Sequence, residues 1–154
     1  MEERESVAGT GEAIVSFINY SCIHSLMCKF SFRNTPNGMP GNSDAGALNS
    51  WLIWQMLGLY PIVTQPVYLL ESPWFKDINM TVNRNRTLRI TAEGLGEDSY
   101  YVQGVKINGV QWDKNWFEHD DVMVEGGTIE FELGSEPRVW ETGDVPPSPG
   151  HVVL

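Results

Sequence analysis

The spacing of apolar residues changes near residue 60 and divides the chain into two kinds of structure. Between residues 47 and 57, apolar side chains recur every three or four residues, as they do in a helix. From Ile62 onward, apolar and polar residues alternate in short runs that are typical of strands. This pattern predicts an α+β protein in which a helix precedes a small antiparallel β-sandwich.

The helix has a predicted start and a predicted end. It is expected to begin at Ser43 or Asp44, because either side chain can accept hydrogen bonds from N–H groups of the first turn. Gly58 suits the left-handed residue that follows a helix, and Pro61 blocks continuation. Beside the residues at three- and four-residue spacing, three other apolar side chains widen the apolar face of the helix: Ile53, Trp54 and Leu57. Such a helix needs to be covered on several sides.

The strands follow from period-two alternation and from turn residues. The expected strands are 67–70, 78–82, 88–90, 101–107, 110–112 and 128–133. Asn108-Gly109 lies between two of them and predicts a two-residue type I′ hairpin. Alternation also predicts that Glu130 and Glu132 lie on the solvated face of the last strand, with Glu125 just before it.

Composition narrows the classes of function. The 154 residues carry a formal charge of −10, which argues against electrostatic binding to nucleic acid or anionic lipid. The apolar run from residue 13 to residue 27 is interrupted by polar residues, so we expect no membrane span. The N-terminus is acidic where a signal peptide is basic, so no signal peptide is expected.

Two cysteines and three glycosylation sequons give weaker signals. Cys22 and Cys28 are too few for a disulfide scaffold, and His24 beside them leaves a zinc site one ligand short, so unpaired thiols are favoured. The Asn-X-Ser/Thr sequons begin at Asn19, Asn79 and Asn85. They hint at a secretory route.

Several motifs in the same order resemble glycoside hydrolase family 92. They are Gly38-Met39-Pro40-Gly41-Asn42-Ser43-Asp44-Ala45-Gly46, Ser50-Trp51, Leu57-Gly58-Leu59-Tyr60-Pro61, Glu71-Ser72-Pro73-Trp74-Phe75, Val105-Lys106-Ile107-Asn108-Gly109 and Gly126-Gly127-Thr128-Ile129-Glu130-Phe131. The resemblance covers about residues 34–140. On this basis we expect four segments: an unmatched stretch 1–33, a loop and helix 34–60 from the end of the catalytic barrel, a β-rich region 61–140, and a disordered tail 141–154.

The resemblance implies a calcium-dependent exo-α-mannosidase of the secretory pathway, with an N-terminal β-sandwich and an (α/α)6 barrel. The expected fold is therefore the last helix or helices of such a barrel followed by the small sandwich. The implied reaction is inverting hydrolysis of mannose from N-glycans. Inversion uses one carboxylic acid to protonate the leaving oxygen and one carboxylate to activate water. By resemblance Asp44 is the general base, and Asn42 orients Asp44 or the water.

The chain also departs from the family pattern. Ala47 and Leu48 stand where members commonly have Gln and Met. The general acid and most of the calcium and mannose site come from regions before the Gly38 motif, and Glu12 stands in no catalytic context. We therefore expect a C-terminal fragment whose partner is the missing N-terminal part of the enzyme. Such a fragment should have little activity alone.

Some of these residues have simpler interpretations. Without the resemblance, Asp44 is a helix cap. For Trp51 and Trp54, packing in the core is favoured over a platform that binds sugar. For His119-Asp120-Asp121, with Glu118, a solvated turn is favoured over a metal site. The rival function is a stand-alone carbohydrate-binding or protein-interaction β-sandwich without catalysis.

Overall fold

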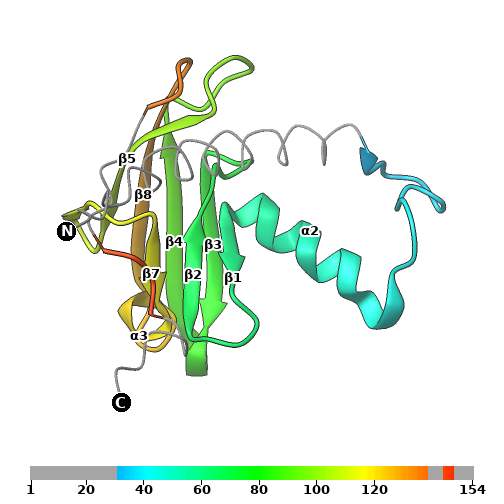
Figure 1. Cartoon of the computed structure of the whole chain (residues 1–154), viewed down its shortest axis with the longest axis horizontal. Helices are drawn as coiled ribbons and strands as arrows, with labels where there is room; N and C mark the ends of the chain where they lie inside the picture. The colour runs from blue at the N-terminus through cyan, green and yellow to red at the C-terminus, as the bar shows by residue number, and fades with distance from the viewer. Residues whose placement is uncertain (1–30, 139–143, 148–154) are drawn as a thin grey trace, which may run out of the picture.

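A computed structural model describes residues 31–138 and 144–147 (Figure 1). The predictions for Glu12, Asn19, Cys22, His24 and Cys28 lie outside these residues, as does most of the predicted tail. No helix within the described residues is long and apolar enough to cross a membrane.

The predicted helix is α2, Ala47–Leu57, and it ends as expected. Gly58 follows it in the left-handed conformation, with φ 76°, and donates its N–H to the carbonyl of Gln55 at 3.1 Å. The predicted start at Ser43 or Asp44 is wrong. A 3-10 turn, η1 at Asp44–Gly46, comes first, and the left-handed conformations of Ala45 and Gly46 separate it from α2.

Within the described residues, eight strands follow and form two sheets. Strands β1 (Leu59–Pro61), β2 (Val67–Leu70) and β7 (Trp116–Glu118) form an antiparallel sheet in the order β1-β2-β7. The second sheet has the order β3-β4-β8-β5-β6. Its strands are β3 (Asp77–Val82), β4 (Arg86–Glu93), β5 (Tyr101–Ile107), β6 (Val110–Trp112) and β8 (Gly127–Gly134).

One pair of strands contradicts the antiparallel prediction. β4 and β8 run parallel, with Leu88 opposite Gly127 and Glu93 opposite Glu132. β5, β6, β7 and α3 lie between β4 and β8 in the chain, so the chain re-enters the sheet beside β4 in the same direction. Alternation within a strand cannot reveal this, because it does not depend on the direction of the neighbour.

The core lies between the two sheets. A single cluster of buried side chains draws Leu59, Leu70 and Phe117 from the smaller sheet and Leu88, Ile90, Ile129 and Phe131 from the larger one. This packing confirms a β-sandwich, which we define as residues 59–134. Figure 1 shows α2 and the loop before it extending to one side of the sheets. We define residues 31–57 as the helical arm.

Two local predictions have clear outcomes. Asn108 and Gly109 both have positive φ and join Ile107 to its partner Val110, so the type I′ hairpin is confirmed. The expected turn at residues 119–121 is instead a short helix, α3, at His119–Val122. A capping box stabilises α3, since the backbone N–H of Glu118 donates to Asp121 Oδ2 at 2.8 Å.

Candidate functional site at the start of α2

The loop that carries Asn42 and Asp44 lies at the exposed end of the helical arm. Both side chains are exposed, and Asp44 is the first residue of η1. Asp44 is the only acidic residue between residues 31 and 70. Within the described residues its carboxylate makes no hydrogen bond or ion pair. The carboxylate is therefore available to a ligand or to another part of a larger protein.

The interpretation of Asp44 as a helix cap is wrong. Neither η1 nor α2 has a hydrogen bond from a capping side chain. Ala45 has φ 52° and Gly46 has φ 77°, so two left-handed residues separate Asp44 from the first residue of α2.

A side-chain bond nevertheless holds this loop to the helix. Ser43, which lies between Asn42 and Asp44, donates its hydroxyl to Asn49 Oδ1 at 2.8 Å. Asn49 is on the first turns of α2 and also lines a hollow of about 560 Å³. The bond therefore links the Asn42–Asp44 segment to a residue of the hollow.

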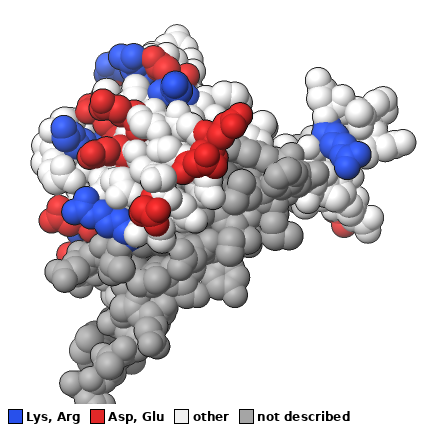
Figure 2. Space-filling model, turned by 90° about the horizontal axis from the view of Figure 1, so that it is seen from above, with Lys and Arg blue, Asp and Glu red and all other residues white. Residues whose placement is uncertain are grey.

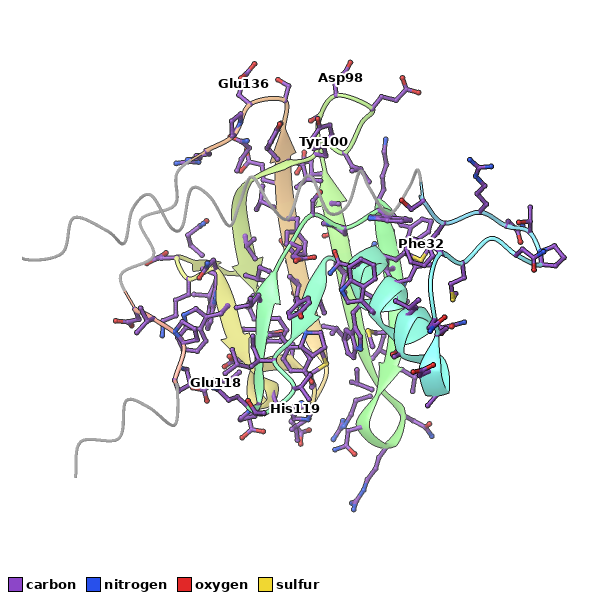
Figure 3. The ribbon with its side chains drawn as sticks, turned by 45° about the vertical axis from the view of Figure 1, so that its right-hand side comes forward. Phe32, Asp98, Tyr100, Glu118, His119 and Glu136 are labelled. Carbon is purple, nitrogen blue, oxygen red and sulfur yellow. The ribbon has the colours of Figure 1, made fainter. Side chains whose placement is uncertain are left out.

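The hollow lies between α2 and the turn that begins the described chain. Its lining residues are Phe32, Arg33, Asn34, Thr35, Pro36, Gly38, Met39, Asn49, Leu52, Met56 and Trp74. Figure 3 labels Phe32, which lies beside α2, and its ring is 6.1 Å from that of Trp51. No carboxylate is among these lining residues. A second carboxylate for acid–base chemistry has to come from beyond them.

A buried polar pair lies at the other end of α2, where the arm meets the sandwich. Gln55 on α2 and Glu71 after β2 are only 1% and 4% exposed. Burial raises the pKa of the Glu71 carboxyl to about 7, an effect that the nearby Gln55 amide opposes. Neither polar atom of that amide makes a full hydrogen bond to any described residue. The junction therefore contains a carboxyl group, that of Glu71, which holds its proton to a higher pH than an ordinary glutamate does.

Backbone bonds fasten the same junction. The N–H of Glu71 donates to the carbonyl of Gly58 at 2.8 Å, and that of Trp74 donates to Met56 at 3.1 Å. A Cβ on Gly58 would lie 2.7 Å from Pro73 N and 2.9 Å from the Glu71 carbonyl oxygen. Only glycine allows this close approach and the left-handed φ together.

A row of aromatic rings connects the arm to the far edge of the smaller sheet. Trp54 lies 5.7 Å from Tyr68, whose ring stacks on Phe117 at 5.0 Å. The Tyr68 hydroxyl is 2.9 Å from His119 Nδ1. Figure 3 shows His119 and Glu118 at the end of the sheets opposite Asp98 and Glu136. Trp54 packs against the core cluster, which confirms its interpretation as a core residue, whereas Trp51 contacts Phe32 outside that cluster.

Metal ligands do not gather in the described part of the chain. Within residues 31–138 and 144–147, no three His, Cys, Asp or Glu side chains form a group that could hold a metal ion. Calcium takes six to eight oxygen ligands. Asn42 and Asp44 offer two oxygen-bearing side chains, which is fewer than calcium takes. His119 and its acidic neighbours contribute to α3 instead.

Sequence reasoning missed Gln55 and Glu71. The available signal was the position of Gln55, which shares the helical spacing of the apolar residues Trp51 and Leu52. An amide on an apolar face indicates a buried polar contact. Glu71 gives a weaker signal, because a glutamate directly after an apolar strand is usually exposed.

Known proteins share both the sequence and the fold of this chain. A family model described as the glycosyl hydrolase family 92 catalytic domain matches residues 21–135. The match begins before residue 34. The stretch 1–33 was expected to be unmatched, and this is wrong for residues 21–33. An uncharacterized secreted glycosidase from Arthroderma benhamiae is 36% identical over 124 residues, which are 77% of this chain and 16% of that protein.

Solved structures agree with the sequence match. A family GH92 α-mannosidase from Bacteroides thetaiotaomicron matches with a TM-score of 0.76 and 25% identity over 84% of this chain, and it was also solved with mannoimidazole bound. An inverting family GH92 mannosidase from the same organism shares the fold, with a TM-score of 0.75 and 22% identity over 88% of this chain. The chain spans 18% and 20% of these two proteins. With a family model that matches most of its length, the chain belongs to glycosyl hydrolase family 92.

Proposed function

We propose that this chain is the base-carrying C-terminal portion of an inverting α-mannosidase that acts on the mannose residues of N-glycans. The observation that carries the proposal is the position of Asp44. It is the only acidic residue of the helical arm, it is exposed, and it has no partner among the described residues. Ser43 holds its loop to Asn49 at the hollow.

In this proposal Asp44 removes a proton from water while the water oxygen forms a bond to C1 of the mannoside. The bond from C1 to the leaving oxygen breaks on the opposite face, which inverts the anomeric centre. Asn42, with amide donors and an acceptor, orients the water or Asp44. A carboxylic acid from a part of the enzyme outside this chain protonates the leaving oxygen.

Calcium enters the proposal only through the family resemblance. In the family pattern most of the calcium site comes from regions before the Gly38 motif, so in this proposal most of its ligands belong to other parts of the enzyme. We further propose that the enzyme is secreted, because the relative from Arthroderma benhamiae is described as a secreted glycosidase.

Two assays of mannose release test the proposal. The first uses this chain alone on an α-1,2-linked mannobiose, with calcium or with a chelator. We expect little or no turnover, because removing an acid or a base costs about 10²–10⁴-fold in rate. Strong chelator-sensitive turnover that Asp44→Asn abolishes would show that this chain carries a whole active site.

The second assay uses a chimera in which residues 34–135 of this chain replace the matching segment of the secreted Arthroderma glycosidase. We expect the chimera to hydrolyse α-mannosides, Asp44→Asn to lose about 10²–10⁴-fold in kcat, and the control Glu97→Gln to keep full activity. Equal activity of the Asp44→Asn chimera would refute the role of Asp44. Saturable mannoside binding by the isolated chain, together with an inactive chimera, would favour the rival carbohydrate-binding function.

A further inference from the structure

The hairpin of β3 and β4 carries two Asn-X-Thr sequons that the mannosidase function does not use. They are Asn79-Met80-Thr81 within β3 and Asn85-Arg86-Thr87 at the turn into β4. We propose that Asn85 is an N-glycosylation site and that its glycan stands at the turn between β3 and β4. This inference goes beyond the proposed function, since the oligosaccharide is a covalent modification and not a substrate.

The turn presents Asn85 openly. Asn83–Asn85 form a 3-10 turn, η2, and the N–H of Arg86 donates to the carbonyl of Asn83. Arg84 and Asn85 both have positive φ, at 45° and 68°, a conformation that asparagine tolerates better than most residues. The turn lies at the same end of the sheet as α3 (Figure 1), and Asn83 Nδ2 donates to the Val124 carbonyl there.

All three residues of this sequon are exposed. The Asn85 amide makes no hydrogen bond to any residue that the structure describes. Arg86 forms an ion pair with Glu125 at 3.1 Å, which turns the middle residue of the sequon toward Glu125. A sugar on Asn85 Nδ2 therefore displaces no contact of the fold.

Asn79 differs from Asn85 in its surroundings. It lies in the middle of β3, opposite Arg89, and its amide donates to Asp77 Oδ1 at 3.4 Å. Asp77 is bound by Arg89 through two further hydrogen bonds of 3.1 and 2.7 Å. A glycan on Asn79 would stand against this ion pair. The comparison favours Asn85 as the modified residue of the hairpin.

The reaction has one co-substrate, an oligosaccharide linked to a lipid through a diphosphate. Asn85 Nδ2 forms a bond to C1 of the first sugar and loses one proton to a base of the transferase. The bond between C1 and the diphosphate oxygen breaks, and the lipid diphosphate leaves with the electron pair. Thr87 supplies the hydroxyl that defines the acceptor sequence.

The test is translation of the full chain behind a cleavable signal peptide in the presence of microsomes. Products protected from added protease are treated with an N-glycosidase in heavy-oxygen water, which labels every asparagine that carried a glycan, and are mapped by mass spectrometry. We expect labelled Asn85, and complete loss of that label in Asn85→Gln and Thr87→Ala. Thr87→Ser is the matched control and should keep it, because serine also completes the sequon.

Gel mobility before and after deglycosylation gives a second readout. We expect Asn85→Gln to remove one glycan from the product, and Asn79→Gln to leave the mobility unchanged. An unlabelled Asn85 in a protected product would overturn the proposal, whether or not Asn19 or Asn79 is labelled. Because microsomal transfer does not require export of a folded protein, a variant that folds poorly still gives an answer.

Discussion

The helical arm and the β-sandwich bury their apolar residues to different extents. In the sandwich, Leu88, Ile90 and Ile129 are completely buried between two sheets. In the arm, α2 is rich in apolar residues, yet its only buried side chain is Gln55, and Ile53 is 56% exposed. The sandwich holds a core of its own, whereas the arm presents a surface that suits further protein.

Charge differs between the two regions as well. Between residues 31 and 60 the charged side chains are Arg33 and Asp44 alone. Figure 2 shows acidic and basic side chains mixed over the sandwich, while the projecting part is mostly uncharged. A surface depleted of charge is typical of the core of a protein contact region, and a mixed-charge surface is typical of a solvated one. The comparison places the buried core in the sandwich, and under the proposed function the reactive carboxylate belongs to the arm.

The largest expected effect comes from emptying the core of the sandwich. Phe131→Ala removes a ring that is 2% exposed and should lower the free energy of unfolding by about 3–5 kcal/mol. Its matched control in the arm, Ile53→Ala, should change it by less than about 0.5 kcal/mol, because more than half of that residue is already exposed. Urea denaturation measures both. Equal losses would show that the arm and the sandwich do not differ in this way.

The second effect concerns the junction between the two regions and depends on pH. Burial raises the pKa of Glu71 to about 7 in the folded chain, above its ordinary value of 4.5. The folded state then binds the Glu71 proton more tightly than the unfolded state does. Protonation of Glu71 therefore stabilises the folded chain fully below pH 4.5, and this contribution is lost as the pH rises through 7. The difference between pH 4.5 and pH 8 should be about 3 kcal/mol.

Glu71→Gln tests this dependence, because glutamine is neutral at every pH. The variant should lose most of the fall in unfolding free energy between pH 5 and pH 8, while Glu97→Gln in an exposed loop should keep it. An unchanged pH profile in Glu71→Gln would mean that another group produces the dependence.

The smallest of the three effects compares two left-handed glycines at the two ends of α2. Gly58→Ala adds a Cβ that meets the backbone of Pro73 and Glu71, and it should cost about 2–3 kcal/mol of unfolding free energy. Gly46→Ala has the same φ to within a degree but no atom within 4 Å, so only the strain of about 1 kcal/mol remains. Thermal unfolding distinguishes the two. Similar costs would argue against tight contact at the junction.

Much of the fold follows from the sequence alone. Alternation located six of the eight strands, and Asn108-Gly109 identified the hairpin, because these patterns reflect which face of a strand is buried and which residues accept positive φ. Gly58 marked the end of α2 for the same local reason. The three-residue strands β1 and β7 were missed, since so few residues carry no period, whereas the equally short β6 was located by the hairpin turn before it.

Other features depended on contacts between distant parts of the chain. The parallel pairing of β4 with β8 depends on how the chain re-enters the sheet, and the burial of Gln55 against Glu71 depends on how α2 meets the sandwich. Neither is encoded by a local period. Asp44 combines both kinds of information. The sequence alone identified it as a candidate base through family resemblance, and only the structure showed that two left-handed residues follow it and that its side chain caps neither helical segment.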